Sequence, residues 1–185
     1  MGSLKLEPAV SRLDLLAAPV AAALEVMPPE APVDGDQVMV APIDPDLADT
    51  AAFCEAYGVR PEESANCVIV AGRRGEVTRY AACVVLATTR ADVNGVVRRY
   101  LDARKASFAP MADAVRLTGM EFGGITPIGL PKEWPILVDS RVVATPHVVV
   151  GSGVRHSKIS VAGPALGALP GAEVIDGLAT EPRST

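Results

Sequence analysis

The chain of 185 residues is poor in the side chains that carry most enzyme chemistry, with three cysteines, two histidines and 4% aromatic residues. Cys54, Cys67 and Cys83 are widely spaced and each lies in an apolar run, which predicts small buried hydrophobes and excludes a disulfide framework or a zinc site. The low aromatic content disfavours a nucleic-acid platform built from several stacked rings. We therefore expect neither a metal site nor a cofactor.

Long apolar runs are absent as well. No run approaches the roughly 20 residues that cross a bilayer, and the N-terminus lacks the basic-then-apolar pattern of a signal peptide. A soluble, cytoplasmic protein without a membrane partner is expected. With 17 Lys and Arg against 22 Asp and Glu, the net charge is −5. This balance argues against phosphate binding over the whole surface but leaves room for a local basic patch.

Glycine, in contrast, is concentrated in one stretch, GMEFGGITPIGL, at residues 119–130. Glycine permits positive φ and the close approach of another group to the main chain, and Pro127 restricts Thr126 to an extended conformation. The stretch therefore predicts a stiff loop that presents peptide groups. A pair of plain tight turns between strands fits its composition equally well.

The rest of the chain alternates strand and helix patterns. Residues 65–71 and 77–88 are predicted strands of a hairpin, and the second is apolar at consecutive positions, which indicates burial on both faces. The strongest helix pattern starts at Thr89 and Asp92 and continues to Leu101. Strands in mixed order, with helices gathered between them, predict an α+β fold with a curled mixed sheet.

We divide the chain into an N-terminal helical extension with a linker, 1–36, a core domain, 37–179, and a polar tail, 180–185. Residues 11–26 have apolar side chains at helical spacing, with Pro19 expected to kink or split that helix. The extension is expected to cover a sheet edge or to make a contact in a homodimer.

Charged and polar candidates outside the glycine-rich stretch are few. Neither His147, in a valine-rich strand, nor His156 favours a general base. The segment GSGVR, residues 151–155, could form an anion-binding nest beside Lys158. Asp139 is expected to accept backbone N–H bonds that hold a loop. A basic cluster lies on or just after the strongest helix and is either a solvated face or an RNA contact; its members are Arg98, Arg99, Arg104 and Lys105.

Four blocks together resemble a known family in order and spacing: TGMEFGGITPIGLP, ILVD, VVVGSGVRHSKI and LPGAEVIDGLA. They are similar to the YbaK-type aminoacyl-tRNA editing domains, which are also found beside prolyl-tRNA synthetases. The similarity covers about residue 40 to about residue 179 and is strongest after Gly119. It implies a mixed α+β, barrel-like fold and hydrolysis of the ester that joins a wrong amino acid to its tRNA.

The resemblance also implies roles for individual residues. The loop facing the scissile carbonyl would place water and stabilise the oxyanion with backbone groups. The substrate would be a tRNA mischarged with a small amino acid, with a synthetase as a further partner. Catalytic candidates are Gly123, Gly124, Ile125, Thr126, Pro127 and Asn66; substrate-binding candidates are Asp139, Gly151, Ser152, Gly153 and Arg155; tRNA-binding candidates are Arg98, Arg99, Arg104, Lys105 and Lys158.

One position departs from the family pattern. Such deacylases typically carry a lysine in the first central strand, where this chain has Asn66, which can donate a hydrogen bond but brings no charge. Compensation by Arg73, Arg79 or Arg155 is one alternative. The other is a non-catalytic protein of the same fold that binds an aminoacyl or nucleotide-like ligand or a protein partner.

Overall fold

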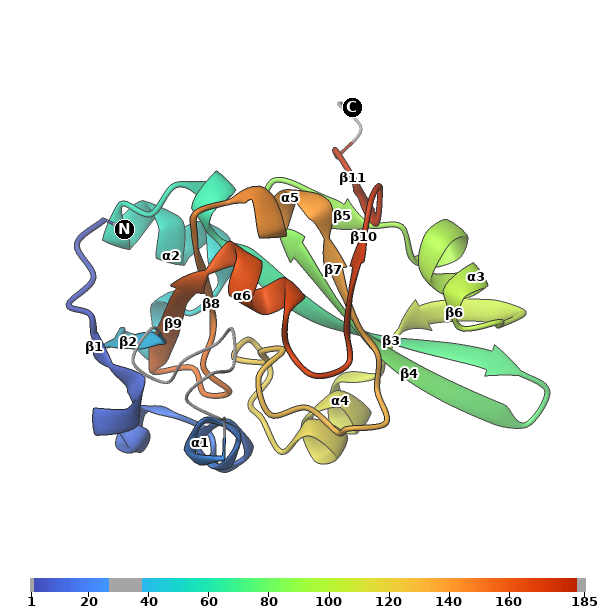
Figure 1. The fold of residues 1–185 in the computed structure, drawn as a ribbon, viewed down its shortest axis with the longest axis horizontal. Helices are drawn as coiled ribbons and strands as arrows, with labels where there is room; N and C mark the ends of the chain where they lie inside the picture. Colours follow the sequence, from blue (N-terminus) through green and yellow to red (C-terminus); the bar gives the residue numbers. More distant parts are fainter. Residues whose placement is uncertain (1, 27–37, 183–185) are drawn as a thin grey trace.

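A computed structural model describes residues 2–26 and 38–182, and their strands form three open sheets (Figure 1). The expected α+β class is confirmed, but none of the sheets in these two segments closes or curls into a barrel, so the barrel-like curling is not confirmed. The strands are β1 (Glu7–Pro8), β2 (Met39–Pro42), β3 (Ala65–Arg74), β4 (Val77–Leu86), β5 (Arg90–Ala91), β6 (Lys105–Phe108), β7 (Ile136–Asp139), β8 (His147–Gly151), β9 (Ser157–Ala162), β10 (Ala172–Ile175) and β11 (Ala179–Thr180).

Two of these sheets meet at the place where the candidate site lies. The five-stranded sheet has the order β10-β7-β4-β3-β6, in which β7 is parallel to both neighbours and β3 is antiparallel to both. The four-stranded sheet, β1-β2-β9-β8, is antiparallel. Ser64, just before β3, bridges Val149 in β8. The start of β3 and the middle of β8 are therefore neighbours in space.

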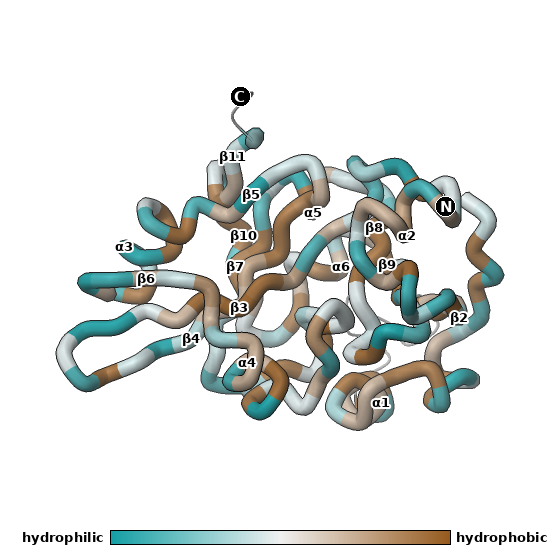
Figure 2. Tube along the Cα trace, turned by 180° about the vertical axis from the view of Figure 1, so that it is seen from behind, coloured by the Kyte–Doolittle hydropathy of each residue, from teal (hydrophilic) through white to brown (hydrophobic). Residues whose placement is uncertain are grey.

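The β3–β4 hairpin extends from a buried base to an exposed tip. In β4, Ala82, Val84 and Leu86 belong to the largest core cluster, whereas Ala81, Cys83 and Val85 face a second cluster beneath the 93–101 segment. The predicted burial of this strand on both faces is thus confirmed. Figure 2 shows the consequence as hydrophobic colour along the middle of β3 and β7 and hydrophilic colour towards the hairpin tip.

The helices are short, and they are α1 (Ala18–Glu25), α2 (Thr50–Tyr57), α3 (Arg98–Tyr100), α4 (Met111–Thr118), α5 (Ser140–Ala144) and α6 (Gly163–Gly167). The segment predicted as the strongest helix is a π-helical turn, Val93–Val97, followed by α3. Asp92 caps it by accepting hydrogen bonds from the N–H groups of Gly95, at 2.9 Å, and Val96, at 3.1 Å. A Cβ on Gly95 would lie 2.1 Å from Oδ2 of Asp92, so glycine permits this cap.

The N-terminal extension packs onto the core. β1 pairs with β2 at the edge of the four-stranded sheet, and Val20 and Leu24 of α1 belong to the largest core cluster. Pro19 is the second residue of α1, in the first turn, where its missing N–H costs no intrahelical hydrogen bond. The predicted linker, 28–36, lies outside the described residues. Within the described residues, no helix is long and apolar enough to cross a membrane.

Candidate functional site

The glycine-rich stretch 119–130 pairs with the second glycine-rich segment, 151–155, through backbone hydrogen bonds. The N–H of Gly153 donates to O of Gly124 at 2.7 Å, and the N–H of Glu121 donates to O of Gly153 at 2.8 Å. The N–H of Arg155 donates to Oε2 of Glu121 at 2.7 Å. The N–H groups of Gly153 and Arg155, expected to form an anion nest, are thus used within the chain.

Glycine at these positions is required by how closely the two segments approach. A Cβ on Gly124 would lie 2.5 Å from the carbonyl O of Val154, and a Cβ on Gly151 would lie 2.2 Å from O of Gly124. Both distances are far below van der Waals contact, and both neighbours are backbone. The close approach expected at Gly124 is therefore to another segment of the same chain.

A cavity of about 490 Å³ lies beside this loop pair, between the start of β3, the end of β8 and the first turn of α2. Gly123 and Ile125 line it from the glycine-rich stretch, and Gly151 lines it from β8. Asn66 lines it from β3, so the structure brings these four predicted site residues together.

The cavity has a polar part and an apolar part. The polar part includes Asn66, whose Oδ1 accepts a hydrogen bond of 2.7 Å from Oγ1 of Thr50. The apolar part includes Phe108, Met111 and Phe122, whose side chains line the cavity although the residues are 59%, 58% and 55% exposed. A ligand could therefore place a polar group inside and an apolar ring at the mouth.

Other predicted site residues lie outside the cavity lining. Thr126 and Pro127 are buried in the loop. The hydroxyl of Ser152 contacts that of Ser157 at 2.7 Å. Gly153 packs against Ala17, the residue that precedes α1. A Cβ built on Gly153 would lie 2.4 Å from Cβ of Ala17. These predicted site residues belong to the loop pair but do not line the cavity.

Asp139 is 1% exposed and holds a different part of the fold together. Its carboxylate accepts hydrogen bonds from the N–H groups of Arg141 and Ala179, at 3.0 Å and 2.9 Å, and from the Arg141 guanidinium. Burial alone would raise the pKa of Asp139, but these hydrogen bonds and the Arg141 charge together lower it below its ordinary value. Asp139 thus joins the end of β7 to β11 and does not line the cavity.

Arg155 connects the glycine-rich stretch to the chain before α2. Its guanidinium donates to O of Pro45 at 3.0 Å and to O of Phe122 at 3.4 Å, and lies 3.7 Å from a carboxylate oxygen of Asp49. It therefore fixes the rim of the cavity next to Gly123, where a Cβ would lie 2.4 Å from Nη1 of Arg155.

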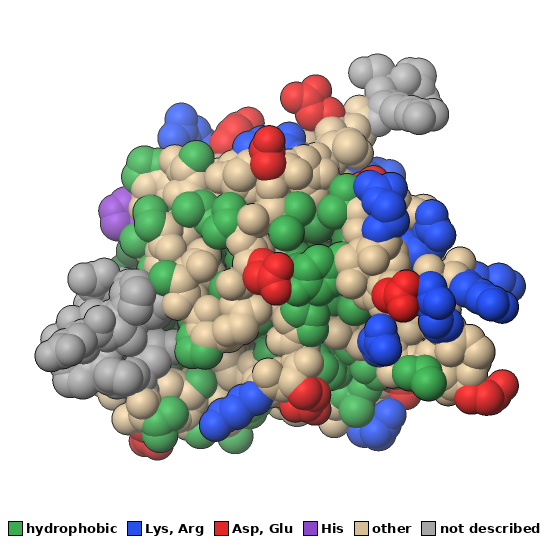
Figure 3. Space-filling model, turned by 45° about the vertical axis from the view of Figure 1, so that its right-hand side comes forward, with side chains coloured by type: hydrophobic (Ala, Val, Ile, Leu, Met, Phe, Trp, Pro, Cys, Tyr) green, Lys and Arg blue, Asp and Glu red, His purple; other side chains and the backbone are tan. Residues whose placement is uncertain are grey.

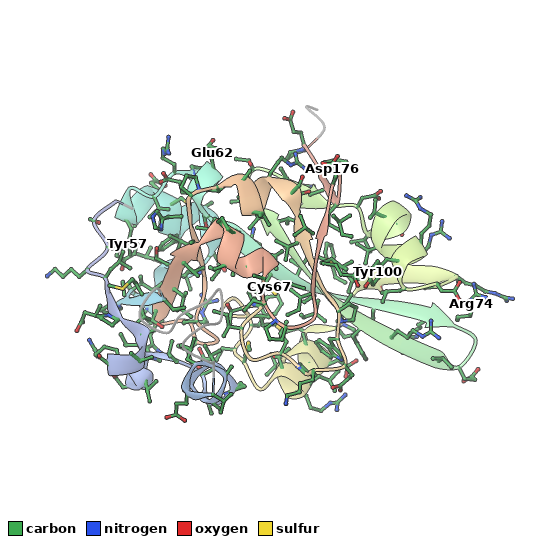
Figure 4. The ribbon with its side chains drawn as sticks, viewed as in Figure 1. Tyr57, Glu62, Cys67, Arg74, Tyr100 and Asp176 are labelled. Carbon is green, nitrogen blue, oxygen red and sulfur yellow. The ribbon has the colours of Figure 1, made fainter. Side chains whose placement is uncertain are left out.

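The basic cluster lies on a separate face, which comes forward at the right of Figure 3. Arg73 and Lys105 are opposite each other in the β3–β6 pair, and both line a shallow depression with Arg98 and Arg104. Figure 4 shows Arg74 and Tyr100 at this same end of the molecule, whereas Cys67 lies near its centre. Arg99 is exposed on α3.

Lys158 does not belong to that basic face. It is 8% exposed, lines the cavity from β9, and its Nζ donates to O of Ala48 at 2.9 Å. A surface contact with tRNA therefore does not fit its position. The charge of Lys158 lies inside the site because β9 pairs with β8 and sets Lys158 opposite Gly151.

Cys67 lines the cavity as a free thiol, and burial raises its pKa far above the ordinary range. A thiol with a raised pKa is a poor nucleophile at neutral pH. Across residues 2–26 and 38–182, no group of three His, Cys, Asp or Glu side chains could hold a metal ion.

Sequence reasoning missed several cavity residues. Thr50 begins α2, and Phe108 and Met111 lie on either side of Pro110, in segments that carry no catalytic motif. Phe122 lies inside the glycine-rich stretch, whose pattern predicts a role for the backbone and none for this side chain. Its 55% exposure is unusual for phenylalanine, and no feature of the sequence distinguishes it from a buried one.

Comparison with known proteins identifies the family of the chain. Residues 44–169 match the model of the aminoacyl-tRNA editing domain. A solved structure described as a candidate trans-editing enzyme for prolyl-tRNA synthetase has a TM-score of 0.70 at 22% identity, covering 86% of this chain and 94% of that chain.

Two further solved structures share the fold. The hypothetical protein APE2540 has a TM-score of 0.65 at 21% identity, covering 77% of this chain and 90% of its own. A candidate signal transduction protein from Marinobacter aquaeolei VT8 has a TM-score of 0.54 at 18% identity, covering 90% of this chain and 31% of its own. Because the family model matches well over half of the residues, the chain belongs to the aminoacyl-tRNA editing domain family.

Proposed function

We propose that this protein is a cytoplasmic aminoacyl-tRNA deacylase, which hydrolyses the ester of a tRNA mischarged with a small amino acid. The observation that carries the proposal is the cavity of about 490 Å³ beside the glycine-rich stretch, into which Asn66 and Gly123 both face. An aminoacyl ester is already activated, so hydrolysis needs a placed water and donors for the developing oxyanion more than a nucleophilic side chain.

The two parts of the cavity match the two parts of such a substrate. The ester and the amino acid would enter between Gly123, Asn66 and Thr50, where hydrogen-bonding groups are available. The terminal adenine would stack at the mouth on Phe108 or Phe122, and such stacking contributes about 1–3 kcal/mol per base. The walls around the inner, polar part of the cavity would then limit the size of the amino acid that is accepted.

The basic face provides a path for the rest of the acceptor arm. β6 runs from Lys105, on the basic face, to Phe108, at the cavity mouth. Phosphates along Arg73, Arg98 and Arg104 would place the 3′ end at Phe108. The basic face is continuous with the cavity, so one ligand could occupy both. This supports tRNA over an acidic protein partner.

The proposal is tested by deacylation of a panel of tRNAs mischarged with small amino acids. Mischarged tRNA for proline is the first member, since a structural relative is described as a trans-editing enzyme for prolyl-tRNA synthetase. Hydrolysis above the spontaneous rate is expected for at least one member. Saturable binding of the panel without turnover would instead support the non-catalytic binding protein, and spontaneous rates throughout would overturn the deacylase.

Charge reversal tests the tRNA path. Arg98, Arg99 and Arg104 changed together to Glu are expected to raise KM and to flatten its salt dependence, because fewer counterions are released on binding. The matched control reverses three exposed cations elsewhere, Lys5, Arg60 and Lys132. Equal changes in KM and in its salt dependence for the two triple variants would show that the net charge of the protein, and not the basic face, determines tRNA binding.

A further inference from the structure

Lys158 is a buried cation in the wall of the candidate site, whereas its sequence pattern predicted a contact with tRNA. β9 places it opposite Gly151 of β8 on one side and Ala41 of β2 on the other. Its ammonium lies 5.3 Å from the centre of the Phe53 ring, and Ala48 O accepts one of its three hydrogens. The side chain thus crosses the apolar base of α2 to reach the polar part of the cavity.

Burying this ammonium is unfavourable for folding. Desolvation lowers the pKa of Lys158, and the nearby Arg155 lowers it further, while Asp49 acts in the opposite direction. Asp49 is exposed and pairs with Arg155 at 3.7 Å, so no carboxylate within the described residues forms a salt bridge with Lys158. A purely structural side chain at this position would be better replaced by an apolar one of similar length.

The other cations considered as substitutes for the missing lysine are engaged elsewhere. Arg73 is exposed on the basic face, and Arg79 donates to O of Leu101 at 3.3 Å. Arg155 holds O of Pro45 and O of Phe122 at the rim. Among these basic side chains, Lys158 is the one that lines the same cavity as Asn66 and Gly123.

We propose that Lys158 is a catalytic residue of the deacylase proposed above, and that it supplies from β9 the positive charge that Asn66 does not bring to the cavity. Its ammonium donates a hydrogen bond to the carbonyl oxygen of the ester. The ligand group it recognises is therefore an oxygen that gains negative charge during the reaction.

The step balances without a cofactor. Water forms a bond to the ester carbonyl carbon, and the carbonyl π electrons move to the oxygen beside Lys158. The tetrahedral intermediate then collapses, and the bond to the ribose oxygen breaks. One proton of the water ends on that ribose oxygen, so the products are the free amino acid and a tRNA with its terminal hydroxyl restored. Lys158 keeps its proton, since it only stabilises the oxyanion.

The experiment compares the full chain with Lys158→Met, which retains the length of the side chain and removes the charge. We expect kcat on the best member of the mischarged panel to fall by about 100-fold, as for loss of one oxyanion donor, with KM nearly unchanged. The Tm is expected to stay equal or rise, because a buried charge is removed. Lys132→Met, at an exposed position, is the matched control and should change neither kcat nor Tm.

A second variant separates a catalytic from a structural role. Asn66→Lys in the Lys158→Met background returns an ammonium to the cavity from β3, and we expect it to restore kcat by at least about tenfold. A lowered Tm together with unrescued kcat would assign Lys158 to structure and overturn the proposal. So would a loss confined to KM.

The two proposals fail in different ways. A wild-type protein that hydrolyses nothing in the panel overturns the deacylase itself. A wild-type protein that is active, with Lys158→Met equally active, overturns the role of Lys158 and leaves the deacylase standing.

Discussion

The two walls of the cavity are built in opposite ways. The loop wall, which we define as residues 119–130 together with 151–155, is shaped by backbone: Gly124 and Gly151 are in contact through main-chain atoms. The strand wall, which we define as the start of β3, the first turn of α2 and Lys158, presents side chains, with Thr50 bonded to Asn66. The shape of the loop wall depends on the absence of side chains at its glycines, whereas the chemistry of the strand wall depends on the side chains that its residues present.

This difference has a physical consequence for mutation. A Gly→Ala change in the loop wall adds a methyl group that must displace backbone. This lowers the stability of the fold because two hydrogen-bonded segments have to shift together. Exchanging a side chain in the strand wall leaves the backbone in place and changes the chemistry. We therefore expect loop-wall variants to lose stability and activity together, and strand-wall variants to lose mainly activity.

The largest effect is expected from Gly151→Ala. Its Cβ would lie 2.2 Å from O of Gly124, so the two segments must separate, and overpacking of this kind destabilises by about 3 kcal/mol. For a chain of this length the Tm should fall by about 10 °C, with deacylation abolished. Differential scanning calorimetry measures the change.

Gly75→Ala at the hairpin tip is the control for that variant. Gly75 has φ of +61° and no atom within 4 Å of a built Cβ, so only backbone strain of about 1 kcal/mol is expected. If Gly151→Ala is no less stable than Gly75→Ala, the loop wall can accommodate a side chain by moving. The proposed difference in rigidity between the two walls would then be wrong.

A smaller effect is expected from Arg155→Ala, at the junction of the two walls. The variant loses the hydrogen bonds to O of Pro45 and O of Phe122, and the partly exposed site limits the loss of stability to about 1 kcal/mol. Because Gly123 is less firmly held, kcat/KM should fall by roughly tenfold.

Arg155→Lys tests whether geometry or charge matters at this junction. A lysine cannot reach both carbonyls with a planar fork, so it should resemble Arg155→Ala in kcat/KM. Wild-type turnover by Arg155→Lys would assign the residue to electrostatics and remove it from the positioning of the loop wall.

The smallest effect is expected from Thr50→Val in the strand wall. The change keeps the shape of the side chain and removes the donor to Oδ1 of Asn66, so the Asn66 amide is less well oriented. We expect kcat to fall by roughly fivefold, with the Tm lowered by no more than about 3 °C. Thr50→Ser retains the hydroxyl and should keep wild-type kcat; equal kcat values for the two variants would exclude this hydrogen bond from the site.

Local features of the sequence predicted the elements whose shape depends on neighbouring residues alone. The consecutive apolar residues of β4 predicted its burial on both faces, as the two core clusters confirm. The helix expected from Asp92 was wrong in type, because Gly95 lets the Asp92 carboxylate close a wider turn. Helix periodicity does not distinguish these two outcomes.

The side chains of the strand wall could not be found in the same way. Thr50, Asn66 and Lys158 are separated by 16 and 92 positions, and ordinary residue types at such distances carry no shared pattern. Lys158 in particular follows a segment that suggested an exposed anion site. Only the pairing of β9 with β8 and β2 turns its side chain inwards.

By itself, the sequence determined that backbone is positioned at residues 119–130 and that the chain resembles an editing domain, because glycine spacing and motif order are properties of the chain alone. Only the tertiary structure decided which segment this backbone contacts. That segment is 151–155, which packs in turn against α1. It also decided which cation lines the cavity. Charge and burial depend on which strands become neighbours, and strand pairing is a long-range outcome that no local pattern encodes.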